Sequence, residues 1–141
     1  MAYPEALLPL DFLELADEFL WTYHHAPPTR PPYWPRYFLL CHAIELVLKA
    51  YLALYGFTPD ELQKEFGHNL EKLLDKAVEL GLQISQSAQN EIKLLNEAHT
   101  EHWPRYPRED AKPAFIISHF EPYVEELFDA VRLKVRGPSP P

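Results

Sequence analysis

The sequence is poor in cysteine, glycine and basic residues, and each shortage excludes a class of site. A single cysteine, Cys41, excludes an internal disulfide and a cysteine-rich zinc site, and it suits a reducing compartment. Four scattered glycines exclude a glycine-rich phosphate loop. The 13 Lys and Arg against 21 Asp and Glu give a net charge of −8. This charge disfavours broad binding to nucleic-acid backbones but leaves room for a local basic patch.

The sequence also lacks an uninterrupted apolar run. The segment 37–56 is the only membrane candidate, and it carries His42, Glu45 and Lys49 near its middle. A charge at the centre of a membrane helix costs about 2.5–3.5 kcal/mol. The first 19 residues have no basic region and turn acidic at once, unlike a signal peptide. We therefore expect a cytoplasmic protein that does not enter a membrane.

Proline, in contrast, is abundant and unevenly placed. Of the 15 prolines, only Pro59 lies between Arg36 and Trp103. Proline ends helices because it lacks the N–H donor and its ring clashes with the preceding turn, so the proline-poor stretch predicts long helices. Apolar residues recur there at helical spacing, and glycines mark where helices stop. The predicted helical segments are about 10–25, 35–56, 58–66, 70–80, 87–100 and 121–135, with a shorter piece at 113–119.

No segment shows the two-residue alternation of a strand, so the predicted fold is all-α. We expect a four- to five-helix up-and-down bundle in which 58–66 is only a short helical turn. The length of 141 residues fits one domain, placed at 1–137. The proline-rich segment 26–35 is predicted to be a stiff linker, and 138–141 a disordered tail.

The helix predicted at 35–56 is apolar on almost every side and carries one polar stripe. At about 100° per residue, His42, Glu45 and Lys49 fall within an arc of about 60°. Glu45 and Lys49 are four residues apart in the favourable order for an ion pair. Two interpretations remain open. The stripe is either an internal ion pair beside a hydrogen-bonded histidine, or it faces a cleft or dimer interface that a ligand or partner completes.

Two further segments are candidates for binding. His68 and Asn69 stand where the helix at 70–80 begins, so either side chain can cap that helix, and His68 can instead line the same cleft as Glu45. In the loop after residue 102, Arg105, Tyr106 and Arg108 combine aromatic and guanidinium groups, which suits a nucleotide or RNA. The alternative is that these side chains close the end of the bundle and pair with acidic residues.

We expect no metal site and no cofactor. Of seven histidines, His99 and His102 have a spacing that can chelate from one helix end. No HExxH motif or paired cysteine spacing supports such a site.

The ordered segments HAIELVLKAYLALYG (42–56), GHNLEKLLDKAVELG (67–81) and RYP (105–107) resemble the HEPN family of small helical domains. That pattern has Glu and Lys one turn apart on an apolar helix. A Gly, a linker and a His-Asp/Asn-Leu helix opening follow, and then an Arg-Tyr-Pro loop before the last helix. The resemblance covers about residues 36–134.

The resemblance implies a four- or five-helix bundle that commonly forms a homodimer and is often encoded beside a nucleotidyltransferase. Some members are metal-independent ribonucleases with Arg and His four to six residues apart at the dimer cleft. Others are non-catalytic binding or accessory modules. Arg36 and His42 match that spacing. The family places the motif on a late helix, however, and Arg36 is about 120° away from the His42 stripe.

These comparisons favour a dimeric binding or accessory module without catalysis of its own. It would bind a nucleotide or RNA, or partner a nucleotidyltransferase, through His42, Glu45, Lys49, His68, Arg105, Tyr106 and Arg108. The alternative is a metal-independent ribonuclease of a toxin–antitoxin or defence system, for which Arg36 and His42 are the catalytic candidates.

Overall fold

The computed structural model describes residues 8–27, 34–100 and 117–137. The described elements are α1 (Pro9–His25), α2 (Trp34–Ala53), α3 (Pro59–Glu65), α4 (Leu70–Glu79), α5 (Gln86–Thr100), the 3-10 helix η1 (Ile117–Phe120) and α6 (Glu121–Arg136). No strand occurs in these ranges, which confirms the all-α bundle predicted from the sequence. The described ranges hold six α-helices, more than the predicted four to five, because the prediction counts the seven-residue α3 only as a short helical turn.

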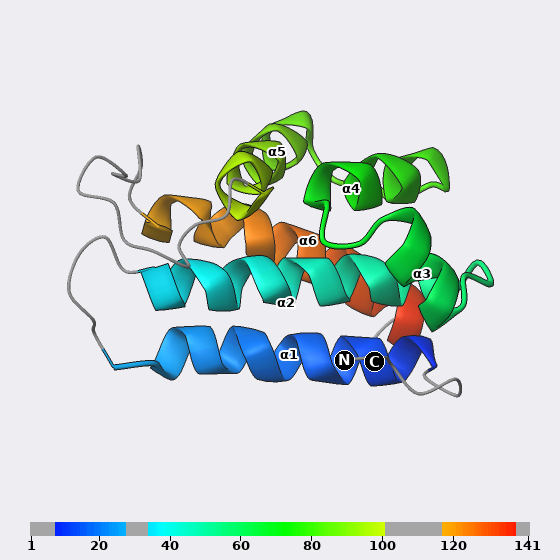
Figure 1. The fold of residues 1–141 in the computed structure, drawn as a ribbon, viewed down its shortest axis with the longest axis horizontal. Helices are drawn as coiled ribbons and strands as arrows, with labels where there is room; N and C mark the ends of the chain where they lie inside the picture. Colours follow the sequence, from blue (N-terminus) through cyan, green and yellow to red (C-terminus); the bar gives the residue numbers. More distant parts are fainter. Residues whose placement is uncertain (1–7, 28–33, 101–116, 138–141) are drawn as a thin grey trace.

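Helix α2 is the central element of the bundle. It packs against α1, α4, α5 and α6. Figure 1 shows α1 running antiparallel to α2 along its whole length, with α4 and α5 on the opposite side. Every residue from 43 to 52 is buried. A helix enclosed in this way needs apolar side chains all round, which explains its weak amphipathicity.

The apolar character of α2 does not make it a membrane span. In the described part of the chain, no helix combines the length and hydropathy that crossing a bilayer needs. The apolar side chains of α2 are instead covered by neighbouring helices, with large buried partners such as Phe12 on α1 and Phe128 on α6.

Proline and glycine set most helix ends, as the sequence predicts. Pro9, Pro59 and Pro122 each lie in the first two positions of a helix, where the missing N–H has no intrahelical partner. Gly81 follows α4 with a φ of +107°, a conformation that side chains with a Cβ rarely adopt. Helix α2 ends at Ala53 rather than at Gly56, because residues 54–56 form a turn closed by i→i+3 hydrogen bonds.

Thr58 caps α3 in the predicted capping box. Its hydroxyl accepts a hydrogen bond from the Glu61 N–H at 3.2 Å, and the Glu61 carboxylate accepts one from the Thr58 N–H at 3.2 Å. Replacing Thr58 by Ala is expected to lower the free energy of unfolding by about 1 kcal/mol, measured by urea denaturation. Thr22→Ala, an exposed threonine inside α1, is the matched control and is expected to have a smaller effect. Equal effects of the two variants would contradict the assigned cap.

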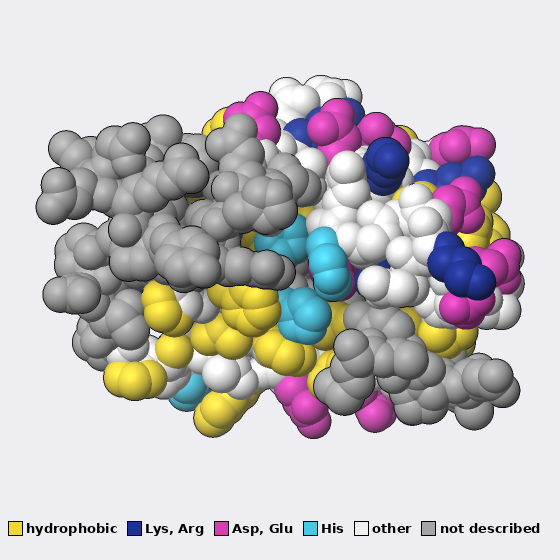
Figure 2. Space-filling view, viewed as in Figure 1, with side chains coloured by type: hydrophobic (Ala, Val, Ile, Leu, Met, Phe, Trp, Pro, Cys, Tyr) yellow, Lys and Arg dark blue, Asp and Glu magenta, His cyan; other side chains and the backbone are white. Residues whose placement is uncertain are grey.

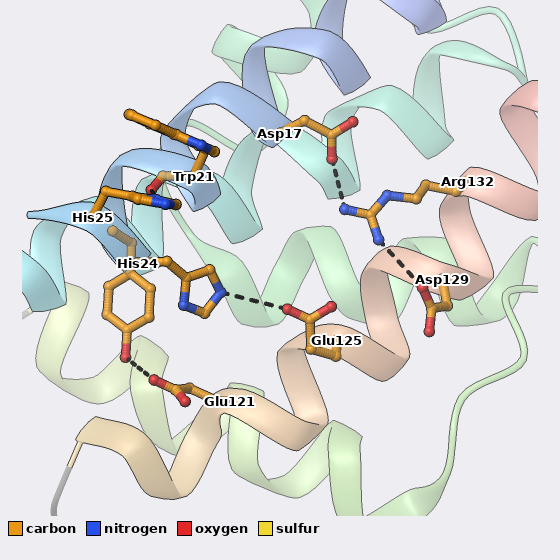
Figure 3. Close-up of polar contacts among 9 residues, drawn as sticks. Asp17, Trp21, His24, His25, Glu121, Glu125, Asp129 and Arg132 are labelled. Atoms are coloured by element: carbon orange, nitrogen blue, oxygen red, sulfur yellow. Dashed lines mark hydrogen bonds and ion pairs between the residues drawn. The ribbon is translucent and has the colours of Figure 1, made fainter.

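Polar contacts join α1 to α6 (Figure 3). Arg132 of α6 binds Asp17 at 2.8 Å and Asp129 at 3.2 Å. Nearer the C-terminal end of α1, His24 lies 3.5 Å from Glu125. All of these pairs are at least partly exposed to solvent, so each contributes little to stability.

Candidate functional site

Glu45 is the centre of a group of polar side chains contributed by three separate segments. Its side chain and that of Lys49 are both 0% exposed, and Lys49 Nζ lies 3.1 Å from Glu45 Oε2. This is the ion pair predicted from the four-residue spacing, and it lies inside the bundle rather than on its surface. Together with His42, His68 and His99 these two residues are called the Glu45 cluster below.

His68 reaches the cluster from the turn between α3 and α4. Gly67 ends α3 with a φ of +55°, and Asn69 caps α4 by accepting a hydrogen bond from the Lys72 N–H at 3.0 Å. His68, between them, points toward α2, where its Nδ1 lies 2.8 Å from Glu45 Oε1. Of the two roles open from the sequence, Asn69 therefore performs the capping and His68 joins Glu45. The His68 side chain is 65% exposed.

His99 approaches the same carboxylate from α5. Its Nε2 lies 3.6 Å from Glu45 Oε1, longer than a hydrogen bond, and this buried atom has no hydrogen-bond partner among the described residues. The ring stands nearly perpendicular to that of His68, with centroids 6.4 Å apart. The sequence places His99 on the inner face of its helix, beside Ile92 and Leu95, but gives no sign that it meets Glu45.

His42 lies at the rim of the cluster between two phenylalanines. Its ring packs edge-to-face on Phe19 at 4.5 Å and parallel to Phe38 at 5.7 Å. Phe38 is 53% exposed, so it presents aromatic surface to solvent. The stripe of residues 42, 45 and 49 predicted from helical spacing is thus enclosed at Glu45 and Lys49 and half-buried at His42.

The surroundings shift the pKa of two groups in the cluster. Burial favours a raised pKa for Glu45, but the interaction with His99, the charge of Lys49 and the contact with His68 outweigh it and lower the pKa to about 2. For His42, burial lowers the pKa, and the attraction of Glu45 only partly offsets this effect. At neutral pH Glu45 is therefore ionised, while His42 is mainly uncharged.

The cluster reaches the molecular surface through its imidazoles. Figure 2 shows histidine side chains gathered near the middle of one face, next to hydrophobic side chains. The buried charges beneath them cancel, since Glu45 is negative and Lys49 positive. A ligand approaching this face therefore meets imidazole N–H groups and ring edges rather than a free carboxylate.

The remaining candidate residues do not join this group. The Arg36 guanidinium lies over the Tyr23 ring, 4.7 Å from its centroid, and Tyr23 donates a hydrogen bond to Glu121 of α6. Arg105, Tyr106 and Arg108 lie outside the described residues, as does His102, whose spacing from His99 is the one that can chelate a metal ion. Within the described ranges, no three His, Cys, Asp or Glu side chains are arranged to hold a metal ion.

The fold and the cluster thus define an all-α bundle with a buried Glu–Lys pair beneath surface imidazoles. No protein-family model, no curated protein and no solved structure matches the chain.

Proposed function

We propose that the chain is a HEPN-like binding or accessory module, dimeric and cytoplasmic, that binds a phosphate-bearing ligand at the Glu45 cluster. The ligand is a nucleotide or an RNA, and a nucleotidyltransferase is the proposed protein partner. The observation that carries this proposal is the approach of two imidazoles, His68 and His99, to Glu45 of the charge-neutral Glu45–Lys49 pair, with His68 at the surface.

The charge balance of the cluster suits an anion. Glu45 and Lys49 contribute no net charge together, so each imidazole that takes up a proton makes the site positive. Protonated imidazole N–H groups form charge-assisted hydrogen bonds to phosphate. The half-exposed ring of Phe38 beside His42 offers a stacking surface for a base. These features support local binding of a nucleotide or RNA by a protein whose net charge is −8.

The local structure also supports the family resemblance. The Glu and Lys one turn apart form a buried pair, and the His-Asn-Leu opening supplies both a partner for Glu45 and the cap of α4. Because Glu45 contacts both Lys49 and His68, and Asn69 caps the helix that follows, we expect these residue types to occur together and in this order along the chain.

The proposal predicts that AMP binds at His68. Adding AMP to the purified protein is expected to shift the imidazole NMR signals of His68. His68→Asn is expected to weaken AMP binding about tenfold, the effect of losing one charge-assisted hydrogen bond. The matched control is His24→Asn, which alters another histidine paired with a carboxylate, far from the cluster on the α1–α6 side.

Ligand binding and dimer formation are tested by separate measurements. AMP and a short RNA that both leave the His68 signals unchanged would contradict ligand binding at this site. Sedimentation analysis tests the dimer independently, and a monomer at all concentrations would remove that part.

A ribonuclease is the second candidate, favoured by the geometry of His68. An exposed imidazole fixed by a buried carboxylate is the arrangement of a general base. If the protein is a ribonuclease, the pure protein is expected to cleave RNA in the presence of a metal chelator, and His68→Asn or His42→Ala is expected to abolish cleavage. Intact RNA after incubation with the wild-type protein would leave the binding module as the function.

A further inference from the structure

His68 differs from the other described surface histidines in how its ring is held. Its Nδ1 contacts a fully buried carboxylate, whereas His24 and His119 contact partly exposed carboxylates through Nε2. A carboxylate ionised at neutral pH can only accept a hydrogen bond, so Nδ1 of His68 carries the proton. The lone pair of the neutral ring is then on Nε2, which makes no hydrogen bond to any described residue.

This arrangement prepares Nε2 as a nucleophile. The ring is fixed in one tautomer, and the side chain is 65% exposed, so a reagent can reach it. When Nε2 forms a bond, positive charge develops on the ring, and the Glu45 carboxylate 2.8 Å from Nδ1 stabilises that charge. His99, with a side chain only 10% exposed, is shielded from such a reagent.

We infer that His68 is a phosphoryl-acceptor site, whose Nε2 takes a phosphoryl group from an N–P or acyl-phosphate donor. The Nε2 lone pair forms the new N–P bond. The bond from phosphorus to the leaving group breaks, and its electron pair departs with that group, as ammonia from phosphoramidate protonated on nitrogen or as acetate from acetyl phosphate. The Nδ1 proton stays on the ring in its hydrogen bond to Glu45. This inference is independent of the proposed binding of AMP.

The neighbouring charges favour the product. Lys49 Nζ lies 3.1 Å from Glu45 Oε2 and balances that carboxylate. The phosphoryl group is therefore added beside a pair without net charge rather than beside an uncompensated carboxylate.

The experiment is a competition within one molecule. The full-length protein is treated with phosphoramidate, and the phosphorylated histidines are located and timed by mass spectrometry under non-acidic conditions. His25 is the internal control, because it is exposed and its Nδ1 also makes a hydrogen bond, at 2.8 Å, but to the uncharged Trp21 carbonyl. We expect His68 to react at least about tenfold faster than His25, because only His68 of these two has a carboxylate placed to stabilise the developing ring charge.

Two further measurements test whether the folded contact between His68 and Glu45 causes the faster reaction. In urea sufficient to unfold the chain, the two histidines are expected to react at equal rates, because the selectivity depends on the folded contact with Glu45. His68→Asn is expected to remove the fast site and leave the His25 rate unchanged. Equal rates in the folded protein, or selectivity that persists in urea, would overturn the inference. Because AMP binding is measured separately, neither result decides the proposed function.

Discussion

Replacing Lys49 by Met is expected to lower the free energy of unfolding by about 3–5 kcal/mol. The substitution keeps most of the apolar stem but leaves Glu45 as a buried negative charge without its closest cation, 3.1 Å away in the wild-type protein. Removing one partner of a buried ion pair costs more than the pair itself contributes, because the remaining charge loses compensation without regaining water. Urea unfolding at neutral pH measures the loss.

The chain supplies a matched control for this variant. Lys64 and Asp60 on α3 have the same four-residue spacing and lie 2.9 Å apart, but both side chains are more than 70% exposed. Lys64→Met is expected to leave the midpoint of urea unfolding almost unchanged, since water solvates the remaining carboxylate. If Lys64→Met and Lys49→Met had similar effects, burial would not be what makes the Glu45–Lys49 pair sensitive.

Replacing both partners at once is expected to be far less harmful than Lys49→Met alone. In the double variant Glu45→Leu/Lys49→Met no charge of this pair remains in the core, and the side-chain volumes are similar. Buried pairs replaced in this way often give proteins as stable as the original, so we expect a free energy of unfolding within about 2 kcal/mol of wild type. A double variant as unstable as Lys49→Met would mean that packing, rather than the stranded charge, causes the loss.

Much of the fold follows from the sequence because local rules set the helix ends. Pro59 and Pro122 begin helices, and Gly81 follows one, at the positions that their backbone preferences require. Where the sequence prediction departs from the structure, the cause is local hydrogen bonding. Helix α2 stops three residues early in a turn, and the described part of the piece expected at 113–119 is the 3-10 helix η1.

The candidate site is only partly predictable for a different reason. His42, Glu45 and Lys49 share one helix, so their common face follows from the helical repeat alone. The contacts of His68 and His99 depend on how α4 and α5 pack onto α2, and that packing is not encoded in any short segment. A histidine on the apolar face of a predicted helix was the available signal for His99, but that pattern does not reveal its partner.

The stability of the protein is expected to fall by about 3 kcal/mol as the pH is lowered from about 5 to about 2, through the protonation of Glu45 alone. The pKa of this carboxyl is about 2 in the folded protein, against an ordinary value of 4.5. A pKa lowered by folding means that the unfolded chain binds the proton more readily. The contribution is therefore complete above about pH 5 and is lost as the pH falls through the unfolded and then the folded pKa.

The double variant Glu45→Leu/Lys49→Met isolates this contribution. Other carboxylates, including Asp17 with Arg132, titrate in both proteins, so their effects cancel when the two pH profiles are subtracted. In the wild type the interactions with His99, Lys49 and His68 keep the pKa of Glu45 low. Urea unfolding at a series of pH values is expected to show a shallower loss of stability for the variant below pH 5. Parallel profiles would show that Glu45 titrates at the same pH in the folded and unfolded chains, and the lowered pKa attributed to its contacts in the Glu45 cluster would then be wrong.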